Sequence, residues 1–238
     1  AAKKICCFDI RSGYFSVLLD EEAKKIFGFQ VDNEYYVYTR LVQGFKNSVA
    51  IFQNLMSKVF SEEAWDRYRK HVKCLENLNY QDTFSIYVDD LVAAVYTLEQ
   101  MFYCAEFALM CVKNAGLKFH PKKMSIDAPT AEVLGFEIRT KRSSYRIATK
   151  RAQAMLNWAF PSTRDAVISR LASLQYFQQC LPGIRYIVFG LTLLAKSKHD
   201  KFYVKKLHKR EFMAMRLLIA MKIEMYMPQL DKPLYVSS

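Results

Sequence analysis

The feature that most constrains this chain is a pair of adjacent acids, Asp89 and Asp90, set between two apolar runs of β-type residues. The runs predict a hairpin over residues 83–95, with the acids at its tip. Another acid, Asp9, ends an apolar run near the N-terminus. Two carboxylates about 4 Å apart repel each other by about 4 kcal/mol at an effective dielectric of 20, so such a cluster requires a counter-ion. Carboxylate oxygens suit Mg²⁺, and the pattern predicts a divalent metal site.

Alternating apolar residues predict further strands in the first part of the chain. Residues 5–19 are apolar and aromatic enough for a strand, which a turn at residues 11–13 interrupts. Residues 25–41 alternate as a hairpin does, and Asp32 and Asn33 are typical of its turn.

Helical spacing begins at Ser48, where apolar residues fall on one face, and the charged stretch over residues 61–76 is expected to continue as helix. A second amphipathic helix is predicted over residues 97–115, with Gly116 in the position of a C-cap. Residues 140–150 are polar and resemble a hinge. Further helices are predicted over residues 150–159 and 163–179.

The composition favours a nucleic-acid partner. The chain has 35 Lys and Arg against 23 Asp and Glu, a formal charge of +12, although many basic proteins bind no nucleic acid. Its six cysteines form neither a zinc pattern nor a convincing disulfide framework, so we expect reduced thiols and an intracellular protein. No apolar run approaches the ~20 residues that cross a bilayer, and no membrane partner is expected.

The motifs resemble those of a known family. Residues 87–90, YVDD, are similar to the signature of reverse transcriptases from retroviruses and LTR retrotransposons. Residues 8–14 resemble the first catalytic motif of that family, and residues 41–48 resemble its nucleotide-side motif. Residues 116–123 and 133–137 are similar to the two motifs after the catalytic hairpin. The motifs occur in family order, which a chance match to four letters would not produce.

The resemblance implies an α+β fold: a right-hand polymerase palm, with an antiparallel sheet backed by helices, followed by a helical thumb. It implies a palm over residues 1–139 with a remnant of the fingers at about 20–44, a thumb over 140–195, and the start of a connection segment over 196–238. In the family, fingers precede the first catalytic acid and a ribonuclease H domain follows the connection. We expect neither the complete fingers nor ribonuclease H activity here.

The function implied is RNA-directed DNA polymerase activity by two-metal nucleotidyl transfer, in a core fragment of an LTR retroelement or endogenous retrovirus. The implied partners are an RNA or DNA template-primer, deoxynucleoside triphosphates, and the rest of a Pol polyprotein or a partner chain that supplies fingers. The cytoplasm, a virus-like particle and the nucleus are all compatible locations. The alternative is a domesticated, catalytically inactive palm that binds nucleic acid or serves in structural assembly. The intact acids favour the enzyme, and the absent fingers favour the alternative.

The resemblance also implies roles for the acids. Asp9 and Asp89 would bridge two Mg²⁺ or Mn²⁺ ions, Asp90 would support the site, and the backbone carbonyl of Ile10 would add a ligand. A polar turn and a strand end are the structural alternative, but that alternative does not account for the neighbouring motifs.

Nucleotide-side roles follow from the same resemblance. Tyr14 would be an aromatic gate against the ribose 2′-hydroxyl, and Gln43 and Gly44 would lie beside the incoming nucleotide. An aromatic core residue and a turn glycine are the alternatives. Lys122 or Lys123 would protonate the leaving pyrophosphate, and two solvated lysines explain the same residues equally well.

The residues Leu134, Gly135 and Phe136 would form the primer grip, for which an ordinary hairpin turn is the alternative. Basic residues of the thumb are candidates for phosphate contacts, and each is also explained as a solvated charge. They are Arg146, Lys150, Arg151, Arg164 and Arg170.

Overall fold

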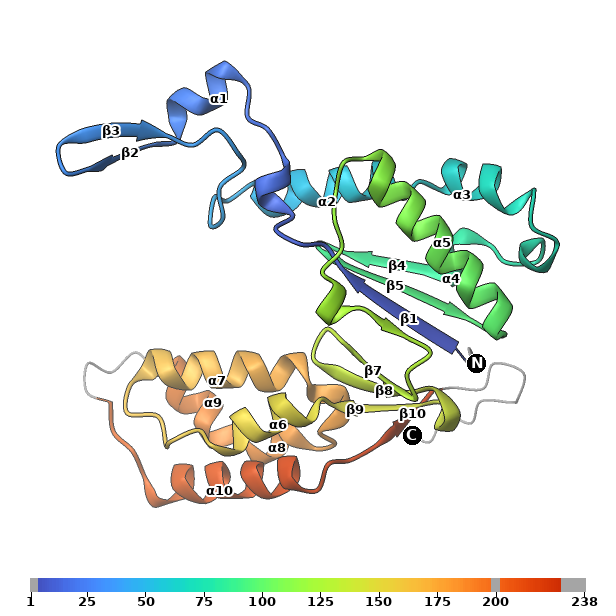
Figure 1. Ribbon diagram of the computed structural model, residues 1–238. Helices are drawn as coiled ribbons and strands as arrows, with labels where there is room; N and C mark the ends of the chain where they lie inside the picture. Colours follow the sequence, from blue (N-terminus) through green and yellow to red (C-terminus); the bar gives the residue numbers. More distant parts are fainter. Residues whose placement is uncertain (1–3, 198–201, 228–238) are drawn as a thin grey trace. The chain divides into compact units, whose positions relative to one another are not determined.

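The computed structural model describes residues 4–197 and 202–227. It divides into two compact units between Ala131 and Glu132, each with its own core (Figure 1). The predicted connection segment over 196–238 lies partly outside the described residues, and the predicted boundaries at 139 and 195 stay predictions. No helix in the described ranges is long and apolar enough to cross a membrane.

The first unit is built on an antiparallel sheet of four strands in the order β4-β5-β1-β6. The central strands are β1 (Lys4–Asp9) and β5 (Asp90–Val95), and the outer strands are β4 (Phe84–Tyr87) and β6 (Ser125–Ile126). Successive side chains of a strand point to opposite faces, and in β5 every second residue is fully buried. The predicted hairpin over residues 83–95 is confirmed.

Two long helices pack on this sheet, α2 (Ser48–Val59) and α5 (Leu98–Asn114) (Figure 1). A capping box starts α5: the Thr97 hydroxyl accepts from the backbone N–H of Gln100, and the Gln100 side chain accepts from that of Thr97. Gly116, at φ +68°, follows its last turn. Both predicted helices are confirmed.

A separate hairpin joins β2 (Gly28–Val31) to β3 (Glu34–Val37), after the short helix α1 (Glu21–Ile26). Asp32 and Asn33 have φ of +49° and +65°, the left-handed pair that a type I′ turn requires. The predicted turn is therefore confirmed, and all residues of both strands are exposed.

Two local predictions in this unit are wrong. The strand expected to resume after residue 13 is instead a 3₁₀ turn, η1 (Tyr14–Ser16), because Gly13 lies directly against the Phe52 ring and the chain turns there. The helix expected over residues 61–76 ends early, at the C-terminus of α3 (Glu62–Arg69).

The early end of α3 has a local cause. The Arg69 guanidinium donates to the backbone oxygen of Glu76 at 2.9 Å, which folds the following segment back. A 3₁₀ turn, η2 (Lys73–Leu75), then buries Leu75, and Leu78 is buried just after it. The next elements are α4 (Tyr80–Thr83) and β4.

The second unit combines a small sheet with a helical bundle. Its sheet has the order β10-β9-β8-β7, with β8 (Phe136–Arg139) and β9 (Ser144–Ile147) inside and β7 (Thr130–Val133) and β10 (Met225–Tyr226) outside. Helices enclose a second hydrophobic core, and those predicted over residues 150–159 and 163–179 are present, each ending three residues earlier than predicted. The helices are α6 (Thr149–Leu156), α7 (Arg164–Tyr176), α8 (Ile184–Ile187), α9 (Phe189–Lys196) and α10 (Lys206–Ala220).

The cysteines carry no reactive thiolate. All six are free, and burial raises the pKa of Cys6 to about 12 and that of Cys7 to about 11. A thiol with so high a pKa is a poor nucleophile at neutral pH.

Candidate active site

The carboxylates predicted from the sequence meet at one end of the first unit's sheet. Asp9 and Asp90 are opposite residues in the register of β1 and β5, and Asp89 immediately precedes Asp90 in the turn. The backbone N–H of Ile10 donates to the oxygen of Asp89 at 2.8 Å, which joins the end of β1 to this turn. Opposite residues of an antiparallel pair have Cα atoms about 4.5–5.5 Å apart, so strand register alone brings these acids together.

The acid turn, residues 87–90, is fixed by a side chain of helix α2. Val88 has φ +57°, a conformation that costs a β-branched residue about 1–3 kcal/mol. Its N–H donates to Gln53 Oε1 at 2.6 Å, and Gln53 Nε2 donates to the Ile86 oxygen at 3.4 Å. Gln53 belongs to α2, so a helix of the core fixes the turn. No local sequence pattern marks Gln53, because its contact with Val88 joins residues 35 apart.

The acids are only partly neutralised. Burial, then the charges of Asp89 and Asp9, raise the pKa of Asp90, and Lys123 offsets this in part. Lys123 Nζ lies 2.9 Å from Asp9 Oδ2, and this hydrogen bond and charge raise the pKa of Lys123. One ammonium therefore faces three carboxylates.

This donor set fits a divalent cation better than a structural role. Hard oxygen ligands with excess negative charge are those that Mg²⁺ and Mn²⁺ prefer. Over residues 4–197 and 202–227, no three Cys, His, Asp or Glu side chains already converge as in a closed metal site. The acids would therefore hold an ion together only after their side chains move.

Helix α2 also orders the residues that the sequence predicts on the nucleotide side. The half-buried Tyr14 ring packs on Phe52 with centroids 5.3 Å apart. A Cβ on Gly13 would lie 2.4 Å from the same ring, so only glycine fits there. The loop before α2 is tied down by Ser48, whose hydroxyl donates to the Val42 oxygen at 2.6 Å.

The predicted nucleotide-side pair lies in this loop. Gln43 and Gly44 are exposed, and Gly44 has φ +87° with open space around it. The backbone conformation at residue 44 therefore favours glycine, and the absence of a side chain leaves room for a ligand.

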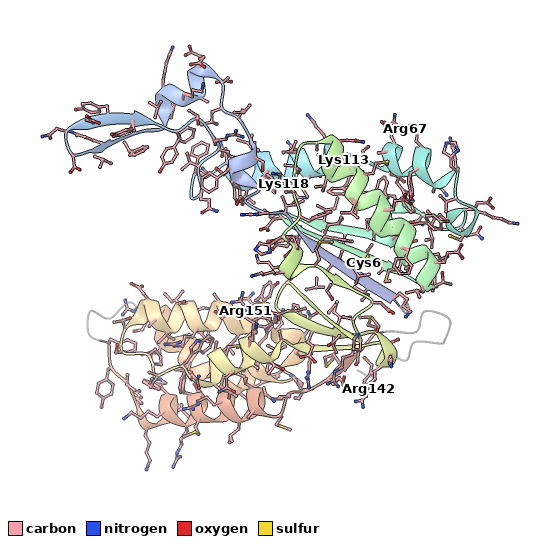
Figure 2. All side chains as sticks on the ribbon, viewed as in Figure 1. Cys6, Arg67, Lys113, Lys118, Arg142 and Arg151 are labelled. Atoms are coloured by element: carbon pink, nitrogen blue, oxygen red, sulfur yellow. The ribbon has the colours of Figure 1, made fainter. Side chains whose placement is uncertain are left out.

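The structure adds a basic hollow that the sequence analysis missed. It encloses about 570 Å³, and its cations are Arg11, Arg40 and Lys118 (Figure 2 labels Lys118). The rest of its lining is Ser12, Phe15, Ser16 and Gly116. No carboxylate lines it, and none of the three cations forms an ion pair within the described part of the chain. Arg11 and Lys118 lie inside the motifs at residues 8–14 and 116–123, and this position was the only sequence pattern that could have pointed to them.

In the second unit, residues 134 and 135 form the two-residue turn between β7 and β8. Leu134 and Gly135 have φ of +50° and +82°, as a type I′ turn requires. The Tyr176 hydroxyl donates to the Leu134 oxygen at 2.9 Å, and the Ala148 N–H donates to the Gly135 oxygen at 2.9 Å. Phe136 packs on Tyr176 and on the neighbouring Phe177. The turn is rigidly supported and presents a partly exposed Leu134.

The predicted phosphate-binding residues differ in availability. Arg146 Nη2 donates to Glu137 Oε1 at 2.7 Å, so its charge is already paired. Lys150 and Arg151 are exposed in the first turn of α6, and Figure 2 labels Arg151. The Arg170 guanidinium lies 4.8 Å above the Trp158 ring. The role of each in binding nucleic acid stays a prediction.

Comparison with known proteins identifies the family. A sequence model of the family described as "Reverse transcriptase (RNA-dependent DNA polymerase)" matches residues 1–138, more than half of the chain. This chain belongs to the reverse transcriptase family. The Gag-Pol polyprotein of avian reticuloendotheliosis virus is 26% identical over 231 residues, which cover 94% of this chain and 19% of that protein. The Pol polyprotein of transposon 412 from Drosophila melanogaster is 24% identical over 196 residues, 82% of this chain and 14% of that protein.

This reverse transcriptase-family chain thus spans about a fifth or less of these relatives. Solved structures of foamy viral protease-reverse transcriptase share its fold. The complex with double-stranded DNA has a TM-score of 0.73 at 20% identity, covering 92% of this chain and 35% of that one. The complex with an RNA/DNA hybrid has a TM-score of 0.72 at 20% identity, covering 92% and 27%. The predicted α+β palm-and-thumb class is therefore confirmed.

Proposed function

We propose that this chain is the polymerase core of a retroviral or LTR-retrotransposon reverse transcriptase and carries out RNA-directed DNA synthesis. The observation that carries the proposal is the acid cluster, where β-sheet register sets Asp9 against Asp90 and a strained turn adds Asp89. Carboxylates gathered in this way repel each other and destabilise the fold unless a cation binds and neutralises them. Family membership supports the reaction class.

The chain's acids supply the metal ligands in this proposal. Asp9 and Asp89 would hold two Mg²⁺ or Mn²⁺ ions, Asp90 would support them, and the Ile10 carbonyl would add a ligand. When bound, such ions activate the primer 3′-hydroxyl and stabilise the charge of the leaving pyrophosphate. Lys123, which touches Asp9, donates a proton to that leaving group.

Nucleotide selection falls to the residues arranged around α2. The Tyr14 ring, supported by Phe52, excludes the 2′-hydroxyl of a ribonucleotide, and Gln43 and Gly44 border the incoming nucleotide. The basic hollow at Arg11 and Lys118 supplies positive charge for polyphosphate on the same unit.

Template-primer is the proposed macromolecular partner. The similar foamy viral enzyme is described in complex with double-stranded DNA and with an RNA/DNA hybrid. In this chain the turn at residues 134–136 would hold the primer strand, and the exposed Lys150 and Arg151 would contact phosphates. The formal charge of +12 supports such contacts.

Primer extension tests the proposal, with the longest polypeptide that the gene encodes. Asp89→Asn should reduce deoxynucleotide incorporation on an RNA template about a thousandfold, since it removes several kcal/mol of transition-state stabilisation. Glu63→Gln is the matched control, because it also removes one negative charge but lies exposed on α3. If the wild type binds template-primer and Mn²⁺ yet incorporates no nucleotide, an inactive palm replaces the polymerase proposal.

A further inference from the structure

We infer that Lys123 is an internal counter-ion of the acid cluster, which competes with a divalent cation for Asp9 and is released from it when a metal ion binds. The inference rests on the proposed function and adds to it a coupling between metal occupancy and the availability of Lys123. Four features of the structure lead to it: the path of the backbone, the contrast with Lys122, the unequal exposure of the pair, and the charge balance.

The backbone delivers Lys123 to Asp9 by a short path. The N–H of His120 donates to the backbone oxygen of Asp9 at 2.8 Å, so this segment is anchored at the very end of β1. The N–H of Lys123 donates in turn to the His120 oxygen at 3.0 Å, in the 3₁₀ turn η3 (Pro121–Lys123). Pro121 fixes its own φ in the first position of that turn. The Lys123 side chain is thus placed beside Asp9 by main-chain contacts.

The neighbouring lysine shows that this placement is specific. Lys122 is exposed and forms no ion pair with any described residue, whereas Lys123 Nζ lies 2.9 Å from Asp9 Oδ2. The two residues have the same charge and adjacent positions in η3. Only one of them is directed at the acids.

The two partners of the ion pair are unequally exposed. The Lys123 side chain is 59% exposed and that of Asp9 only 15%. A lysine has a long flexible stem, so its ammonium can move into water without a change in the backbone. Asp9 stays at the strand end whatever its partner. The lysine is therefore the member of the pair that can be exchanged.

Charge decides which cation remains. A single partly exposed ammonium–carboxylate pair is weak, whereas a divalent ion would draw on Asp9 together with Asp89 and Asp90. Positive charges on the same carboxylate repel each other, so the ion and the ammonium cannot both bind Asp9 at full strength. Once displaced, the Lys123 ammonium remains tethered beside the acids by η3. It thus becomes free to donate to a leaving group when metal is bound.

Metal titration with matched variants tests the inference. Lys123→Met and Lys122→Met remove the same formal charge, but only the first removes the cation in contact with Asp9. Calorimetric titration with Mn²⁺ should show that Lys123→Met lowers the Kd about fivefold relative to Lys122→Met, the size expected for a partly exposed pair. Equal affinities for the two variants would overturn the inference and leave the proposed function standing. A wild type that binds no Mn²⁺ would instead overturn the proposed function and the inference with it.

A labelling experiment on the wild type removes any dependence on how the variants fold. Brief acetylation followed by mass spectrometry should show Lys123 modified several times faster after Mn²⁺ is added, because its ammonium has left Asp9. Lys122 is the internal control and should keep its rate. An unchanged Lys123 rate at saturating Mn²⁺ would contradict release.

Discussion

Each unit of this protein gathers carboxylates beside basic side chains, and the results are opposite. In the first unit, three acids share one lysine, and burial together with the charges of Asp89 and Asp9 holds the pKa of Asp90 above its usual value. In the second unit, Glu137 and Glu224 are surrounded by donors and have lowered pKa values. The contrast separates acids that stabilise their fold from acids that weaken it, and acids of the second kind indicate a candidate functional site.

The second cluster shows what complete pairing requires. Glu137 is opposite Arg146 in the register of β8 and β9. Burial alone would raise the pKa of Glu137, but the hydrogen bond and charge of Arg146, then the bonds from Thr149 and Arg139, outweigh it. Glu224 accepts from the Ser144 hydroxyl at 2.7 Å and pairs with Arg139 and Arg142.

The largest expected change in stability comes from removing Arg146, the main partner of Glu137 in the second unit. Arg146→Met should cost about 2–3 kcal/mol of unfolding free energy, because Glu137, only 17% exposed, loses its nearer cation and keeps only Arg139 at 3.4 Å. Urea denaturation would measure it in a Trp65→Phe background, where Trp158 is the remaining one of the chain's two tryptophans.

The matched control for that change is Arg142→Met. Its side chain is 64% exposed and lies 3.6 Å from Glu224, so the loss should stay within about 0.5 kcal/mol. If Arg146→Met instead weakens template-primer binding without affecting stability, Arg146 is a phosphate contact, as the sequence suggested, and the contrast between the units fails.

A smaller effect of opposite sign is expected in the first unit. Asp90→Asn removes one of the crowded charges and should raise its stability by about 0.5–1 kcal/mol in metal-free buffer at neutral pH. Trp65 fluorescence in a Trp158→Phe background would report it. A loss of stability would mean that Lys123 alone neutralises the cluster.

Sequence patterns predicted the parts of the site that depend on short-range rules. Turn residues such as Asp32 and Asn33 located a hairpin, and Gly116 in the position of a C-cap located the end of a helix, because these preferences act over a few residues. The acids were found because adjacent carboxylates are costly in any fold.

Long-range contacts were out of reach of the same rules. The bond from Gln53 to the acid turn and the pair between Lys123 and Asp9, 114 residues apart, depend on how helices and loops close over the sheet. Arg146 was predicted as a phosphate contact because its strand pairing was not recognised. A hairpin register for residues 136–147 would have placed it opposite Glu137.

The smallest effect is a difference in acid response between the units. The lowered pKa of Glu137 contributes stability above pH 4.5, its unfolded value, and this is lost as the pH falls through the lower folded value. The raised pKa of Asp90 has the opposite effect. Its contribution to stability is complete below pH 3.8, the pKa of the unfolded state, and is lost as the pH rises through the higher pKa of the folded state.

Denaturation between pH 3 and 7, followed at Trp158 and at Trp65 in the two single-tryptophan backgrounds, would measure both slopes. Glu137→Gln should flatten the acid loss in the second unit, and Asp90→Asn should flatten the opposite slope in the first. Slopes of the same sign in both units would show that net charge, and not local pairing, governs the response.

One helix, α2, contacts three separate segments of the proposed site: Ser48 holds the loop before it, Phe52 supports Gly13 and Tyr14, and Gln53 grips the acid turn. The positions of all three segments therefore depend on the position of α2. Motion of α2 as a rigid body carries all three together and preserves their spacing. A substitution that tilts the helix instead changes the distance between Tyr14 and the acids. If Tyr14 selects the nucleotide as proposed, altered packing beneath α2 should change substrate discrimination before it unfolds the protein.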